Sequence, residues 1–327
     1  MDLSARRAGI VTHDELWRVL ECVGIRCEPR KVGVEVSGRT VLDSKGAVAG
    51  ELAHPQVLMS WGRLYSLLRA ALPNGEYHAG KSLTALEQDR AAVTARFADG
   101  STECAELLVA ADGIHSMVRS LIFPAAKPVY AGYFAWRGLV EEQALSAGVR
   151  QVLGDRFGFC LPPGEQMLGY PVAGAGEELR AGRRRYNFVW YRPAGETELA
   201  RLLTDIDGIR HELSIPPNRI RSDVVSELRQ DAERLLAPQF AEVVARTEQP
   251  FIQAIFDLES QHMARGRVVL LGDAAFVARP HVGMGVTKAA GDAAALAHAI
   301  SLTPNDIVAA LARFEAARRP RGMAVLR

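Results

Sequence analysis

The sequence predicts an α/β fold with an α+β insertion, namely an incomplete Rossmann-like domain into which an antiparallel-sheet domain is inserted. Two apolar runs, at residues 107–111 and 268–271, have the pattern of buried parallel strands, and a turn containing Asp and Gly follows each of them directly. From about residue 130, aromatic strands separated by Gly and Pro turns replace this pattern. We therefore expect one sheet built from both halves of the chain and a second sheet between them.

Helix signals occur near both ends of the chain. Thr12 and Glu15 match a capping box, and apolar residues at helical spacing follow. Ser60 is a candidate N-cap for a second helix. Residues 222–236 also have helical spacing, and a further helix is expected from Thr287.

Strand signals fill most of the remaining chain. Short runs of strand character occur at residues 31–58, 92–97, 103–110, 132–140, 156–160, 167–172 and 185–191, and residues 251–271 return the chain to the flavin domain. Asp99-Gly100 predicts a hairpin turn between two of them. The aromatic side chains Tyr170, Trp190 and Tyr191 are either packing residues, which we favour, or walls of a substrate site.

The segment from Gly272 to Gly285 has the outline of a nucleotide site. Asp273 would lie at the carboxyl edge of a parallel strand, where open α/β sheets bind ligands. Gly283 and Gly285 let backbone amides approach a flat ligand, and the following helix directs its positive N-terminus at that ligand. The alternative for Asp273 is an ordinary turn or cap residue.

These segments resemble the FAD-dependent aromatic-ring monooxygenase family related to p-hydroxybenzoate hydroxylase. The family pattern D-G-x-x-S-x-V-R is matched by Asp112, Gly113, Ser116, Val118 and Arg119. The pattern G-D-A-A-x-x-x-x-P-x-x-G-x-G is matched by Gly272, Asp273, Ala274, Ala275, Pro280, Gly283 and Gly285. Residues 8–11, 130–138 and 279–281 look most like the 2,6-dihydroxypyridine 3-hydroxylase branch, and the resemblance spans nearly the whole chain.

The resemblance implies hydroxylation of a small hydroxylated aromatic ring or N-heterocycle, such as 2,6-dihydroxypyridine, with FAD, NAD(P)H and O2. It implies a cofactor-binding role for Gly9, Arg63, Asp112, Gly113, Gly272, Asp273, Pro280, Gly283 and Gly285. His281 would lie beside the flavin ring and is the candidate catalytic residue.

Each of these roles has a structural alternative. Asp112 could cap the helix that begins near Ser116, Arg63 could be solvated in a first helical turn, and His281 could be an ordinary loop histidine. The sequence also departs from the family, because Phe276 and Thr287 stand where many relatives carry histidine and asparagine.

The opening unit of the family is not found in this sequence. Relatives begin with a strand, a G-x-G-x-x-G turn and a helix that hold the FAD pyrophosphate, whereas here residues 1–7 lead straight to Gly9. The near-match at 174–176 is expected to be a hairpin loop, because the fingerprint requires a strand before it and a helix after it. We therefore expect an N-terminal truncation of roughly 30 to 45 residues. The alternative functions are a non-catalytic remnant that does not hold FAD, or a flavin reductase or dehydrogenase.

Residues 1–127 and 251–327 are expected to form the FAD-binding domain, and 128–250 the substrate domain. The formal net charge of +1 gives no electrostatic reason to bind nucleic acid or an anionic membrane. No apolar run suits a signal peptide or a membrane span, so the sequence predicts a cytoplasmic protein. Its four cysteines lack metal-site spacing and are expected to be reduced and mostly buried, with no metal. The expected partners are the aromatic substrate and O2; a homodimer is an open possibility.

Overall fold

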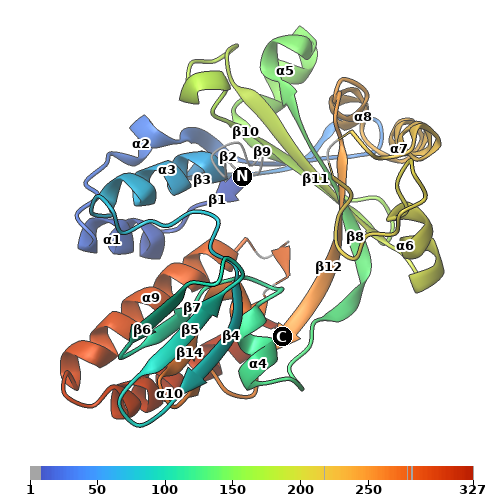
Figure 1. Cartoon of the computed structure of the whole chain (residues 1–327). Coiled ribbons are helices and arrows are strands. Elements are labelled where there is room, and N and C mark those ends of the chain that lie inside the picture. The colour runs from blue at the N-terminus through green and yellow to red at the C-terminus, as the bar shows by residue number, and fades with distance from the viewer. Residues whose placement is uncertain (1–8, 217, 278, 281–282, 327) are drawn as a thin grey trace.

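The computed structural model describes residues 9–216, 218–277, 279–280 and 283–326, which form a mixed α/β fold (Figure 1). The helices are α1 (Asp14–Cys22), α2 (Pro29–Val32), α3 (Trp61–Ala71), α4 (Met117–Ile122), α5 (Ala147–Leu153), α6 (Glu196–Leu202), α7 (Ser222–Leu235), α8 (Pro238–Ala245), α9 (Gly285–Leu302) and α10 (Ile307–Leu326). Short 3-10 turns lie at Glu142–Ala144, Ala175–Glu177 and Gly272–Ala274.

A nine-stranded sheet dominates the described part of the chain, with strands in the order β1-β3-β2-β9-β10-β11-β8-β12-β15. Its strands are β1 (Gly9–Val11), β2 (Val34–Leu42), β3 (Val48–Ser60), β8 (Val129–Glu141), β9 (Arg156–Cys160), β10 (Gln166–Val172), β11 (Arg185–Pro193), β12 (Phe251–Glu259) and β15 (Phe276–Val277). The pair β2 and β9 is parallel and the other neighbours are antiparallel. The predicted aromatic antiparallel sheet is confirmed, and β1, β2, β3 and β12 extend it.

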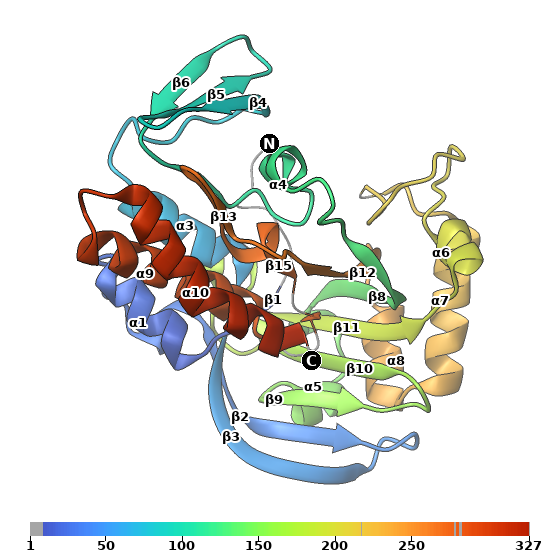
Figure 2. The same ribbon diagram turned by 90° about the horizontal axis from the view of Figure 1, so that it is seen from below.

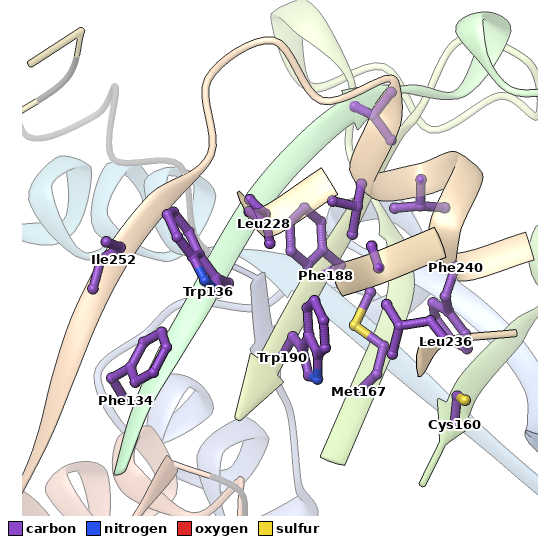
Figure 3. Packing of buried hydrophobic residues seen from close by; sticks show 14 of the residues in the cluster. Phe134, Trp136, Cys160, Met167, Phe188, Trp190, Leu228, Leu236, Phe240 and Ile252 are labelled. Carbon is purple, nitrogen blue, oxygen red and sulfur yellow. The ribbon is translucent and has the colours of Figure 1, made fainter. Parts of the chain in front are cut away.

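Helices α5, α6, α7 and α8 lie along one side of this sheet, away from α9 and α10 (Figure 1). Their apolar side chains and alternate residues of the strands form the largest buried cluster, which includes Trp136, Phe188 and Trp190 (Figure 3). The residues between them along the same strands point to the opposite face, because side chains alternate along a strand. There they form a second cluster with Tyr170, Tyr191 and other apolar residues.

A three-stranded sheet joins the two halves of the chain. It contains β7 (Leu108–Ala110), β14 (Val268–Leu270) and β13 (Ala264–Arg265) in the order β13-β14-β7. β14 pairs with β7 in parallel, with Val269 opposite Val109. The expectation of one sheet from two distant segments is therefore confirmed. Helices α9 and α10 run side by side next to this sheet, and their apolar residues share its core (Figure 2).

Some local predictions are wrong. The run at 103–110 is two strands in different sheets: β6 (Thr102–Ala105) pairs with β5 (Val93–Phe97) next to β4 (Leu83–Gln88), whereas β7 pairs with β14. Thr12 does not cap α1, because its hydroxyl donates to the Val57 carbonyl on β3 and His13 is the N-cap residue. Helix α9 starts at Gly285, two residues before the predicted Thr287.

The cysteines are less buried than predicted. Cys22 and Cys104 are exposed and Cys27 is half-buried, so Cys160 alone is buried among the four. Cys104 lies on β6, and all four residues of this strand are exposed. All four thiols are free. None of the helices in the described ranges combines the length and apolar character that a transmembrane span needs.

The glycine-rich segment at 174–176 is a hairpin connection, as predicted, because it joins the antiparallel strands β10 and β11. The Gly174 amide donates to the Glu178 carbonyl at 2.8 Å. A Cβ atom at Gly174 would lie 1.9 Å from the Arg183 carbonyl oxygen across the loop. The glycine is therefore required by the close approach of two backbone segments.

We expect Gly174→Ala to lower the free energy of unfolding by about 1 to 3 kcal/mol, because the backbone must move to admit a methyl group. Gly148→Ala is the matched control, since Gly148 lies in α5 and a Cβ there meets no atom within 4 Å. That control should gain about 0.5 to 1 kcal/mol from helix propensity. Urea unfolding of both variants checks the prediction, and equal stability of Gly174→Ala and the parent contradicts it.

Candidate functional site

The turn that follows β14 presents Asp273. Gly272 has a φ of +57°, a left-handed conformation that favours glycine, and the chain then makes one 3-10 turn through Ala274. The Asp273 side chain is exposed and makes no hydrogen bond with any described residue. Desolvation nevertheless raises the pKa of its carboxyl, and the nearby Lys288 ammonium partly offsets this rise. The carboxylate is therefore open to solvent and close to enough protein atoms to be partly desolvated.

Three buried charged side chains support this turn, namely Lys288 and Asp292 of α9 and Arg318 of α10. The Asp292 carboxylate on α9 accepts a hydrogen bond from the Gly272 amide at 3.1 Å, and the Lys288 ammonium donates to the Gly272 carbonyl at 3.0 Å. Asp292 also pairs with Lys288 at 3.3 Å and with the Arg318 guanidinium of α10 at 2.7 Å. All three side chains are at most 6% exposed, so each charge depends on its partners.

The segment 112–119 supports the same turn from the other side. Ser116 caps α4, because its hydroxyl accepts from the Arg119 amide at 2.9 Å. The buried Arg119 guanidinium donates to the Ala274 carbonyl at 3.1 Å and to the carbonyls of Ala126 and Ile114. Asp112 accepts from the Val118 amide at 3.3 Å, so the capping role is present, while the side chain remains exposed.

A second glycine turn leads into α9. Gly283 has a φ of +69°, and its amide donates to the Pro280 carbonyl at 3.0 Å. A Cβ at Gly283 would lie 3.5 Å from the Val11 side chain, which places this turn against β1. Within the described residues no side chain caps α9, whose first residue is Gly285. Its first amides are therefore available to a ligand oxygen.

Gly9 lies where β1 meets the large sheet. Its amide donates to the Asn187 side-chain oxygen at 3.3 Å. A Cβ at Gly9 would lie 2.4 Å from the Tyr170 ring, so only glycine fits beneath this tyrosine. Near it, the His13 ring nitrogen Nδ1 is 2.9 Å from the Thr287 hydroxyl at the start of α9. Desolvation and the Arg39 charge lower the pKa of His13.

Arg63 lies in the first turn of α3 as predicted, and its amide donates to the Ser60 hydroxyl at 3.0 Å. Its guanidinium forms no hydrogen bond or ion pair with the described residues. A half-buried cation in this state is suited to an anionic group. Within those same ranges, no cluster of His, Cys, Asp and Glu side chains is arranged to hold a metal ion.

Comparison with known proteins places these features in one family. A model described as FAD binding domain-like matches residues 130–257, and a model of the FAD binding domain matches residues 217–327. The chain is 31% identical to 2,6-dihydroxypyridine 3-monooxygenase of Paenarthrobacter nicotinovorans, over 99% of this chain and 80% of that protein. The chain belongs to the FAD-dependent aromatic monooxygenases.

Other relatives agree with this assignment. A FAD-dependent urate hydroxylase of Klebsiella pneumoniae is 34% identical over 74% of this chain and 55% of its own length. The solved structure of 2,6-dihydroxypyridine-3-hydroxylase from Arthrobacter nicotinovorans superposes with a TM-score of 0.92 at 30% identity, covering 100% of this chain and 81% of that one. The fold predicted from sequence is therefore confirmed, and FAD is the cofactor of this family.

The residues present in this monooxygenase fit a flavin cofactor. Asp273 offers a carboxylate that no described residue uses, the start of α9 offers free amides, and Arg63 offers an unpaired guanidinium. We propose that Asp273 accepts hydrogen bonds from cofactor hydroxyls, that α9 binds a ring oxygen and that Arg63 binds phosphate. Gly9, Gly113, Gly272, Gly283 and Pro280 then shape the backbone around it, and Asp112 stays a proposed contact. His281 lies outside the described residues, and its catalytic role stays a prediction.

Sequence reasoning missed the buried charges below the turn. Lys288 and Asp292 are four residues apart in an otherwise apolar helix, and this spacing is the signal that could have found them. His13 carried no comparable signal, because its partner Thr287 is 274 residues away.

Replacing Asp273 by alanine removes an acceptor from the proposed cofactor hydroxyls and leaves them unsatisfied. That loss costs about 1 to 3 kcal/mol, so we expect FAD to bind about 5-fold to 150-fold more weakly. Fluorescence titration of FAD with parent and variant measures this. Asp99→Ala, in the exposed hairpin between β5 and β6, should leave FAD affinity unchanged. Equal affinity of Asp273→Ala and parent would remove Asp273 from the site.

Asp292→Ala should destabilise the protein far more than removal of a surface charge. The substitution leaves Lys288 and Arg318 buried without a counter-charge, which costs about 3 to 5 kcal/mol. The control, Glu87→Ala, breaks an exposed pair with Arg96 and should cost less than about 1 kcal/mol. Denaturant unfolding of the two variants distinguishes them, and similar losses would contradict a supporting role for Asp292.

Proposed function

We propose that this monooxygenase hydroxylates a small, electron-rich hydroxylated aromatic ring or N-heterocycle, such as 2,6-dihydroxypyridine, with NAD(P)H as reductant and O2 as oxygen source. FAD, when bound, would supply the redox chemistry in which two electrons from NAD(P)H reduce O2, so that one oxygen atom enters the ring and the other leaves as water. The chain itself must bind FAD, position the ring and exclude water.

The observation that carries this proposal is the aromatic face of the large sheet. Phe157, Tyr170 and Tyr191 lie on that face, and the Phe157 and Tyr170 rings meet edge to face at 4.8 Å between centroids. Gly9 packs directly against Tyr170, and Arg279 next to the Gly283 turn stacks over the Tyr133 ring at 5.9 Å. An apolar, aromatic surface thus lies close to the proposed flavin segment and suits a planar ring.

The charge pattern around this face favours water exclusion. Desolvation raises the pKa of Tyr170 and of Tyr133 to about 12, so both phenols are neutral at physiological pH. Arg279 is neutralised by Asp257 through hydrogen bonds of 2.9 and 2.7 Å. A hollow of about 440 Å³ adjoins the end of the face, where Tyr133 and Tyr191 line it. This volume is within the range of small-molecule sites.

The relatives support the substrate class. Three of them are named for 2,6-dihydroxypyridine, urate and 6-hydroxynicotinate, which are small nitrogen heterocycles with polar oxygen substituents. We propose the same class for this chain. The sequence-based division into a FAD-binding domain (1–127 and 251–327) and a substrate domain (128–250) is part of this proposal, with the large sheet shared by both.

Incubation of the FAD-loaded protein with NAD(P)H, labelled O2 and a panel of dihydroxypyridines and dihydroxybenzoates tests the function. We expect one ring to accelerate NAD(P)H consumption and to gain one labelled oxygen atom, measured by mass spectrometry. If rings stimulate NAD(P)H consumption but only hydrogen peroxide forms, the protein is a reductase or oxidase. If no ring stimulates turnover of flavin-loaded protein, the aromatic substrate class is wrong.

A further inference from the structure

Three polar side chains interrupt the aromatic face of the large sheet on adjacent strands. Asn187 comes from β11, Arg137 from β8 and Gln253 from β12. In the register of these strands, Arg137 pairs with Val189 and Gln253 with Ala135. Val189 and Ala135 belong to the apolar cluster of this face. The three polar residues therefore point to the same side as Tyr170 and Tyr191.

Arg137 has no counter-charge. One guanidinium nitrogen, Nη1, donates to the Gln253 side-chain oxygen at 2.8 Å, and the group lies 5.7 Å from the centroid of the Phe251 ring. Its Nε is buried and has no hydrogen-bond partner among the described residues. No carboxylate of the described residues lies within ion-pair distance of it. A cation held this way in an apolar setting is costly unless an anion joins it.

Asn187 supplies a second donor without an acceptor. The residue is 1% exposed, and its side-chain oxygen is engaged by the Gly9 amide. Its Nδ2 is buried and has no partner within the part of the chain that the structure describes. Asn187 pairs with Leu139, so it is the diagonal neighbour of Arg137 across β8 and β11. Diagonal neighbours of this kind are about 7 to 8 Å apart, a separation that a substituted ring can bridge.

We propose that Arg137 and the Asn187 amide form a subsite that binds an anionic oxygen of the substrate ring. This inference rests on the proposed function, since it assigns a chemical feature of the substrate to the same pocket. The oxygen belongs either to an ionised ring hydroxyl or to a ring carboxylate, because both accept from a guanidinium and an amide. An ionised hydroxyl also enriches the ring in electrons, and a nearby cation favours that ionised form.

Arg39 is the internal comparison for this subsite. It lies on β2, over the Phe157 ring at 5.7 Å, and its guanidinium contacts the Gln56 side-chain oxygen at 3.4 Å. It therefore has the same kinds of partner as Arg137. Three strands separate β2 from β8 in the sheet, which places the two arginines about 19 Å apart at about 4.8 Å per strand. One small ring cannot contact both, and the buried amide donor of Asn187 lies on the strand next to Arg137.

Isothermal titration of the FAD-loaded protein with three compounds tests the subsite. 2,6-Dihydroxypyridine offers an ionisable hydroxyl, 2,4-dihydroxybenzoate adds a carboxylate, and 2,6-dimethoxypyridine has neither. For Arg137→Gln we expect the dissociation constant of at least one acidic ring to rise about thirtyfold or more, with a smaller rise for Arg137→Lys. The compound with the larger loss identifies the type of oxygen. Arg39→Gln should bind every ring as the parent does.

A thermal melt without substrate separates binding from support of the fold. Arg137→Gln removes a half-buried charge that has no counter-charge among the described residues, so its Tm should equal or exceed that of the parent. Three results overturn the inference: unchanged affinity for both acidic rings in Arg137→Gln, a lower Tm with equal losses for all three compounds, or a loss of affinity in Arg39→Gln instead.

Labelled-oxygen incorporation by the parent reports separately on the proposed function. If the parent forms labelled product and Arg137→Gln binds both acidic rings as the parent does, the subsite is wrong and the proposed function stands. If binding depends on Arg137 but the parent forms no labelled product, the proposed hydroxylation is wrong and the subsite stands.

Discussion

The rest of the candidate site depends on how one backbone turn, Gly272–Ala274, is held. Its amide and carbonyl groups leave the end of β14 and would be unsatisfied in the interior without partners. Asp292 and Lys288 bind the Gly272 end, and Arg119 binds the Ala274 carbonyl. Side chains from α4 and α9 thus fix one turn, with α10 supplying Arg318 beneath them, so that Asp273 needs no partner of its own. This arrangement links the two chain halves at the same point where β7 and β14 pair.

The large sheet serves two purposes because its side chains alternate. Along β8, Trp136 enters the core beneath α7 and α8, whereas its neighbour Arg137 points to the aromatic face. β11 repeats this, with Phe188 in the core and Asn187 on the face. A one-residue shift of register would exchange the two sets, so the packing of the core side fixes the position of every pocket residue.

Features that depend on nearby residues could be predicted from the sequence, and features that depend on distant partners could not. The cap at Ser60 was recognised because it is completed by an amide three residues away. Thr12 has an equally good local pattern but its hydroxyl binds Val57, 45 residues away, which overrides the capping box. The division of residues 103–110 into two strands has the same cause, because β7 pairs with a strand about 160 residues later. Motif residues such as Asp273 were identified by spacing alone, and their roles stay proposals.

The buried and half-buried arginines show how structural charges and proposed ligand-binding charges differ in this chain. Arg119 donates to three carbonyls, Arg184 pairs with Glu142, and Arg192 pairs with Glu165 and Asp231. The protein itself supplies hydrogen-bond or ion-pair partners to each of these guanidinium groups. Without those partners, a largely buried charge would remain uncompensated. Arg63 and Arg137 lack such partners within the described ranges. Partial desolvation of an unpaired cation adds nothing to the stability of a fold, and a bound anion would offset its cost. We therefore propose anionic ligands for both guanidinium groups, namely cofactor phosphate for Arg63 and an oxygen of the substrate ring for Arg137.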